Sequence, residues 1–156
     1  MATAENARAR LPTTVFSMTS EKAVRWNLAG DTVGRLTADP LSWFDAEHDA
    51  LVGAVRLAAD TGAAESAWGL AAVLVPYFDL RCHFDAWQYT HRIALDAARL
   101  AEDLEGEAAM LRGLAQVCLY QDRYAEAAEM FRRSRVIFRE LGDTRGRRPR
   151  SAGWGR

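Results

Sequence analysis

The sequence has few cysteines that could form disulfide bonds and lacks an apolar run long enough to span a membrane. Its two cysteines, Cys82 and Cys118, cannot build a disulfide framework, so a reducing compartment is expected. The longest apolar run, residues 67–78, falls well short of the roughly 20 residues of a membrane span and contains Pro76. The first ten residues are polar and carry arginine, unlike a secretory signal. These features predict a cytoplasmic protein with no membrane partner.

Lysine is nearly absent too, with Lys22 as its single example, and charge of neither sign is in excess. Lys and Arg total 20 against 21 Asp and Glu, for a net charge of -1. Nothing global therefore favours a nucleic acid or a membrane surface as partner. The sequence G-x-x-x-x-G-K-[ST] does not occur, which excludes a P-loop nucleotide site.

What the chain does contain is an internal repeat with a period of forty residues. Between residues 124 and 141, apolar residues recur at steps of three and four, which is one face of an α-helix. Subtracting forty from Phe131 gives His91, and subtracting forty again gives Leu51. Repeats of this length are built from stacked helix pairs. The period therefore predicts an all-α fold in which antiparallel helix pairs stack as a short α-solenoid.

The same periodicity predicts five helices, over about residues 41–62, 64–78, 84–104, 107–120 and 123–141. Gly106 and Gly142 are expected to end the third and the fifth of them. Three regions follow from this pattern. Residues 1–40 are expected to be poorly ordered, with a short helix near residues 20–28, residues 41–146 to form the repeats, and residues 147–156 to be a disordered basic tail.

The spacing within one forty-residue unit matches the tetratricopeptide (TPR) pattern. That pattern has a large residue and a small one on the first helix, then an aromatic residue and an A-x-x-x-F pair on the second. The residues that fit these positions are Leu111, Leu114, Ala115, Cys118, Tyr124, Ala127 and Phe131. The stretches WFDAEHDALVGAVRLAADTG, AWGLAAVLVPYFDLR, THRIALDAAR and YQDRYAEAAEMFRRS occur in this order. Together they resemble the C-terminal TPR region of large actinobacterial transcriptional regulators of the antibiotic-regulatory-protein (SARP) type and their ATPase-linked relatives.

The resemblance covers about residues 41–146 and implies the sensor or docking array of such a regulator. That array is a protein–protein interaction module, so the resemblance implies neither catalysis nor a cofactor. The DNA-binding region and the ATPase that precede the array in the family have no counterpart in this sequence. After Gly146 the repeat gives way to RRPRSAGWGR. The chain therefore resembles a truncated fragment of a larger regulator.

In stacked helix pairs, the first helix of each pair lines a concave face that binds extended peptides. This reasoning gives five candidate partner-binding residues, namely Arg112, Gln116, Leu119, Tyr120 and Asp79. Arg112 and Gln116 are four residues apart on one helix face and could hold a backbone or carboxylate group of a partner. An ordinary exposed pair is the competing interpretation.

Catalytic and metal-binding patterns are weak. Cys82 and His83 lie in one turn with two aspartates, but adjacent Cys and His do not easily face one ion, so no metal is predicted. His91 occupies a core position of the repeat, and His48 has no Ser, Cys or second His at a fixed spacing. No nucleophile with its base is visible, and the chain is not expected to be an enzyme.

The C-terminal part is rich in arginine, with nine arginines and two acidic residues between residues 132 and 156. This favours, as an alternative function, a nucleic-acid-associated protein that uses the Arg-rich C-terminus. No recognition helix accompanies the charge, so a solvated helix face is the competing interpretation.

Two expectations concern the last helix. Phe131 is predicted to lie in the core with Tyr124 and Phe138, so Phe131→Ala is expected to cost about 3–5 kcal/mol. Three apolar residues lie off that stripe and are expected to form an exposed strip through which the chain self-associates, namely Met130, Val136 and Ile137.

Overall fold

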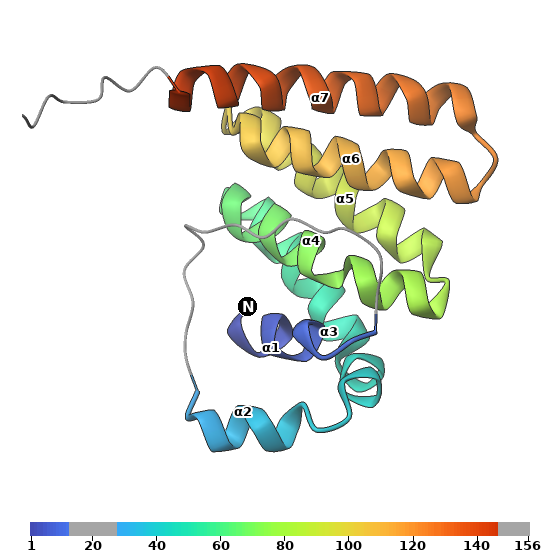
Figure 1. The fold of residues 1–156 in the computed structure, drawn as a ribbon. Coiled ribbons are helices and arrows are strands. Elements are labelled where there is room, and N and C mark those ends of the chain that lie inside the picture. Colours follow the sequence, from blue (N-terminus) through green and yellow to red (C-terminus); the bar gives the residue numbers. More distant parts are fainter. Residues whose placement is uncertain (13–27, 147–156) are drawn as a thin grey trace, which may run out of the picture.

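The computed structural model describes residues 1–12 and 28–146, with side chains described up to residue 142, and the described part contains helices and no strand (Figure 1). Its helices are α1 (Ala2–Ala9), α2 (Gly30–Leu36), α3 (Pro40–Asp60), α4 (Ala64–Arg81), α5 (Phe84–Leu100), α6 (Leu104–Tyr120) and α7 (Tyr124–Gly146). From α3 onward, consecutive helices run antiparallel and are joined by turns of two or three residues. The predicted all-α fold is confirmed, and α3 to α7 correspond to the five predicted helices.

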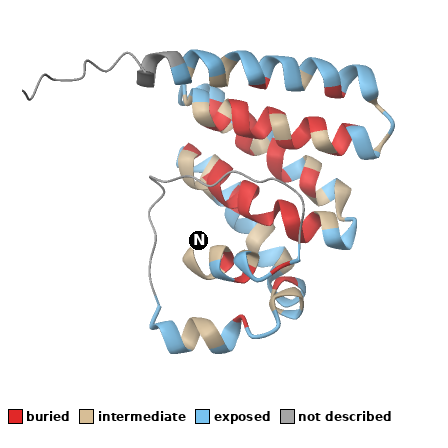
Figure 2. Ribbon diagram, in the orientation of Figure 1, coloured by how far each residue is buried: buried red, intermediate tan, exposed pale blue. Residues whose placement is uncertain are grey.

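Helices α4 and α6 form the centre of the stack. Every residue of α4 from Ala67 to Phe78 is buried, because α1, α3, α5 and α6 all pack against this helix. A helix that is apolar on all sides must be covered on all sides. Figure 2 shows the buried residues concentrated on α4 and α6, whereas most of the outer helix α7 is exposed.

The four turns between α3 and α7 share one backbone geometry. Each contains a residue with positive φ, and these residues are Gly62, Cys82, Glu102 and Asp122, spaced twenty apart. In each turn the amide after that residue donates to the carbonyl five residues earlier, at 2.8–2.9 Å. This is the Schellman motif that closes helices in a left-handed residue. The forty-residue sequence period is therefore also a period of the backbone.

Glycine is present at only the first of these four turns. Replacing Glu102 by glycine is expected to raise the free energy of unfolding by about 0.5–1 kcal/mol, because a left-handed backbone is strained for a residue with a Cβ. Urea denaturation measures the change. Gly62→Ala at the equivalent turn is the matched control and should lower stability. A loss of stability in Glu102→Gly would contradict this account of the turns.

The predicted ends of two helices are wrong. Gly106 does not end a helix but lies in the first turn of α6, where Asp103 caps the helix. One carboxylate oxygen of Asp103 accepts from the Gly106 amide at 3.0 Å, and the other accepts from Trp68 Nε1 at 2.8 Å. A Cβ on Gly106 would lie 2.4 Å from the Trp68 ring, so glycine serves close helix contact at this position. Gly142 also ends no helix, because α7 continues to Gly146.

Parts of residues 1–40, which were predicted to be poorly ordered, form helices. Helix α1 buries Ala4 and Ala7 against the core, and α2 lies within the same segment. The Thr37 hydroxyl donates to Asn6 at 2.9 Å, and Arg10 donates to the Thr37 carbonyl at 3.1 Å. Of the short helix expected near residues 20–28, all but the last residue lies outside the described residues, as does the tail at residues 147–156.

Candidate functional site

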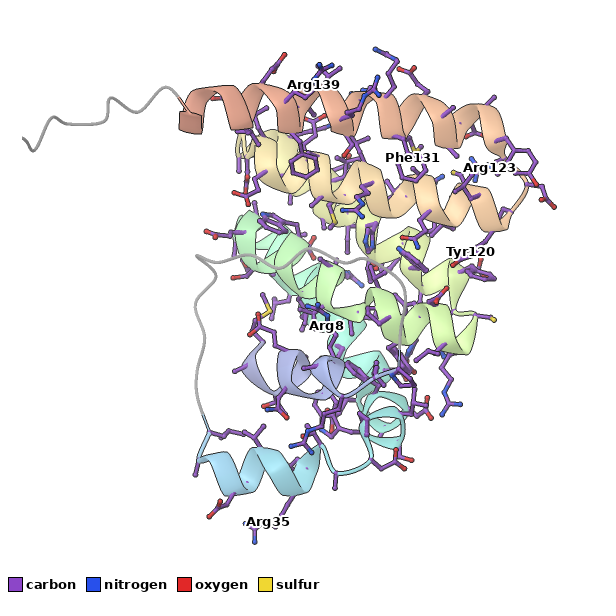
Figure 3. The ribbon with its side chains drawn as sticks, viewed as in Figure 1. Arg8, Arg35, Tyr120, Arg123, Phe131 and Arg139 are labelled. Carbon is purple, nitrogen blue, oxygen red and sulfur yellow. The ribbon has the colours of Figure 1, made fainter. Side chains whose placement is uncertain are left out.

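Tyr120 is the last residue of α6, and its ring packs against aromatic residues of α5 (Figure 3). The ring centroid lies 5.3 Å from that of Phe84 and 6.2 Å from that of Trp87, both on α5. The hydroxyl lies near the side chains of Asp79, which raises its pKa, and Gln116, which lowers it. Burial, together with the bond to Asp79, raises the pKa of Tyr120. The side chain nevertheless remains 46% exposed, so Tyr120 is an ordered aromatic residue on an open surface.

The structure brings three of the five predicted site residues together. Asp79 on α4 and Gln116 and Tyr120 on α6 form the cluster just described. Leu119 is exposed beside Tyr120. Arg112, one turn before Gln116 on the same helix, lines a hollow between α6 and α7 to which Gln116 and Tyr120 do not contribute. The predicted partner-binding residues therefore belong to two surfaces of α6, one around Tyr120 and one beside Arg112.

The hollow beside Arg112 has a volume of about 440 Å³. Its other lining residues all come from α7, and they are Phe131, Ser134, Arg135, Phe138 and Arg139. A second hollow of about 250 Å³ shares Phe131 and Arg135 with the first and extends it to Ala128 and Arg132. Together they form a groove along α7, which we call the end groove. Figure 3 labels Phe131 and Arg139 on this helix.

The assignment of Phe131 to the core is wrong, because its side chain is 36% exposed in the end groove. Tyr124 is also exposed, whereas Met130 and Ile137, predicted to be exposed, pack against the core. Of the predicted exposed strip only Val136 is open to solvent. The buried residues of α7 up to residue 142 are the small residues Ala127 and Ser134. The hydroxyl of buried Ser134 donates to the Ala108 carbonyl at 2.7 Å, which requires close approach of the α7 and α6 backbones.

A polar cluster that the sequence analysis missed joins α3 to α4. The Tyr77 hydroxyl donates to Asp45 at 3.2 Å and lies 3.2 Å from His48 Nδ1. Arg81 forms an ion pair with Asp45 and holds the pKa of that carboxyl below its usual value, while burial raises the pKa of Tyr77 to about 12. Tyr77 therefore stays protonated and acts as a donor. Helical spacing relates residues on one helix but does not show which helices meet, so the pairing was not visible.

The turn at residues 82–83 shows no metal-binding arrangement. His83 lies against His48, with 4.8 Å between ring centroids, while Cys82 is exposed. Burial and the nearby His48 lower the pKa of His83. Within the described ranges, no three His, Cys, Asp or Glu side chains are grouped so that they could hold a metal ion.

Two arginines of the basic C-terminal part form ion pairs with acidic side chains. Arg132 pairs with Glu129 at 2.6 Å, and Arg133 reaches Glu107 on α6 at 3.5 Å. These two arginines are therefore partly neutralised. Four further arginines, in residues 147–156, lie outside the described residues.

None of the helices in the described ranges is both long enough and apolar enough to cross a membrane. Comparison with known proteins adds no relative to this description. No family model, no curated protein and no solved structure matches the chain.

Proposed function

We propose that this chain is a non-catalytic helical-repeat module that binds another protein or peptide through the surface around Tyr120. The observation that carries the proposal is an exposed aromatic side chain held by its neighbours. Phe84 and Trp87 support the ring, and the side chains of Asp79 and Gln116 lie near the hydroxyl. Tyrosine residues of this kind are enriched among the residues that dominate binding energy at protein interfaces.

The ordering of Tyr120 matters because binding costs conformational entropy. Immobilising a mobile side chain costs about 0.5–1.5 kcal/mol, and a side chain already held by its neighbours avoids most of that cost. Leu119 adds exposed apolar area beside the ring, and Asp79 and Gln116 supply polar groups to a partner backbone. Such a surface suits an extended peptide better than a small polar ligand.

The TPR assignment and the link to SARP-type regulators are part of this proposal. The four equivalent turns support a repeat of helix pairs, and the sequence stretches quoted above support the likeness to the regulator array. On this proposal the chain acts as a docking element and other proteins supply the DNA-binding and ATPase activities.

The binding surface can be tested with a phage-displayed library of random peptides selected on the wild-type protein. We expect enriched peptides whose affinity falls about tenfold or more in Tyr120→Ala, in line with an interface hot spot. Tyr89→Ala is the matched control, because Tyr89 on α5 is similarly exposed, at 43%. Selection of no peptides, or peptides that bind Tyr120→Ala as well as wild type, would count against the proposal.

The nucleic-acid alternative predicts a different result. A protein that binds through arginine–phosphate contacts loses affinity for duplex DNA steeply as salt rises. Titration of the full chain with duplex DNA at increasing salt separates the two functions. We expect no such binding at physiological salt, because no recognition helix accompanies the charge and two of these arginines, Arg132 and Arg133, are paired with glutamates.

A further inference from the structure

Helix α5 shows what covers the equivalent of the end groove one repeat earlier. There α6 packs against a face of α5, which we call the seat of α6, and His91 on this face is only 1% exposed. The contact is close, because a Cβ on Gly113 of α6 would lie 2.3 Å from the His91 ring. At the rim, Arg99 of α5 pairs with Glu107, in the first turn of α6, at 3.0 Å. The seat thus takes a helix that offers a small residue at its centre and a carboxylate near its start.

Adding forty residues carries this seat onto α7. Phe131 takes the place of His91, and Arg139 takes the place of Arg99. Phe131 is 36% exposed where His91 is 1% exposed, so the equivalent seat is open. Among the residues whose side chains are described, no carboxylate pairs with Arg139 or with Arg135.

We propose that the end groove binds an amphipathic helix of another protein, with a small residue opposite Phe131 and a carboxylate near its N-terminus paired with Arg139. This surface is distinct from the one around Tyr120, so the two proposals stand or fall separately.

The dimensions of the groove fit a helix. From Ala128 to Arg139 it follows about three turns of α7, or roughly 16 Å. Phe131 and Phe138 are two turns apart on this face. A docked amphipathic helix presents apolar residues at i, i+3 or i+4, and i+7 and can reach both rings.

The charge of the groove selects the partner. Arg112, Arg135 and Arg139 surround the two phenylalanine rings. A second copy of this chain fits less well, because a symmetric contact through this face would set these arginines against their own equivalents. A bound helix with an acidic edge would place carboxylates beside the arginines of the end groove.

The structure itself supplies the probe, since α6 is the helix that fills the equivalent seat. A fluorescein-labelled peptide of residues 103–120 with Cys118→Ser is titrated with the full chain and followed by anisotropy. We expect saturable binding, and binding about 3- to 10-fold weaker for the same peptide with Glu107→Lys. No saturation up to about 1 mM, or equal binding of the two peptides, would overturn the proposal.

Variants of the protein locate the site. Phe131→Ala should weaken binding of the peptide about tenfold or more, as truncation of a central aromatic anchor does. Arg139→Glu should reverse the preference and favour the Glu107→Lys peptide. Val136→Ala is the matched control, because Val136 is an exposed apolar residue of α7 that does not line the groove. Binding unchanged in Phe131→Ala would place the peptide elsewhere and refute the assignment.

The competing occupant is a second copy. Sedimentation equilibrium of the wild type, with no peptide present, should show a monomer at micromolar concentrations. A dimer that Phe131→Ala dissociates would show that the chain fills its own groove, and the proposal of a heterologous helix would then be wrong.

Discussion

Replacing Trp87 by alanine is expected to lower the free energy of unfolding by about 3–5 kcal/mol, the cost of emptying a large aromatic site in a core. Trp87 is completely buried and packs between α5 and the end of α6, where its ring contacts Tyr120 and His91. The loss should appear as a lower denaturant midpoint with little change in slope. Since a small domain is stable by only about 5–15 kcal/mol, this change approaches the limit of what the fold tolerates.

Two further variants decide whether burial is the cause. Trp87 Nε1 is buried and has no hydrogen-bond partner in the described part of the chain. Trp87→Phe removes that unsatisfied donor along with some volume, so it should cost much less than Trp87→Ala. Phe131→Ala should cost under about 1 kcal/mol, because Phe131 is already partly solvated. Equal losses in Trp87→Ala and Phe131→Ala would contradict the burial pattern.

The contrast between these residues shows what the sequence period could predict. Forty-residue spacing identifies equivalent positions, and the four equivalent turns follow that spacing. Burial is a property of neighbours, however. His91 is covered because α6 follows α5, whereas the equivalent Phe131 is exposed in the end groove. The pattern of one unit therefore predicts its helices but not which face of the last helix is covered.

The candidate site was predictable to a similar extent. Helical spacing placed Gln116 and Tyr120 on one face of α6, and the repeat placed Asp79 on the neighbouring first helix, where its side chain raises the pKa of Tyr120. The division into two surfaces was not predictable, because it depends on how α7 lies against α6. The packing depends on Ser134, which contacts the backbone of Ala108 closely. Periodicity alone does not show whether α7 packs on α6 through Ser134 or through its phenylalanines.

Acid should destabilise the fold through His91. Burial lowers the pKa of His91 from its ordinary value of 6.5 to about 3, and the hydrogen bond to the Trp87 backbone opposes this only in part. Because the folded pKa lies below the unfolded one, the unfolded chain binds the proton first as the pH falls. Stability from this residue is therefore complete above about pH 6.5 and is lost toward pH 3, by about 1.4 kcal/mol per pH unit.

The measurement is urea denaturation of wild type and His91→Gln at several pH values between 7 and 5. Glutamine removes the titrating group at the same buried position, so the variant should be less stable at pH 7 but should lose less stability as the pH falls. Other groups that titrate in this range, including His83, are present in both proteins and cancel in the difference. The imidazole is 1% exposed and packs directly against Gly113, with no space for a Cβ between them. Parallel stability curves for the two proteins would therefore mean that His91 accepts a proton in the folded state, and that the seat of α6 on α5 is looser than the structure places it.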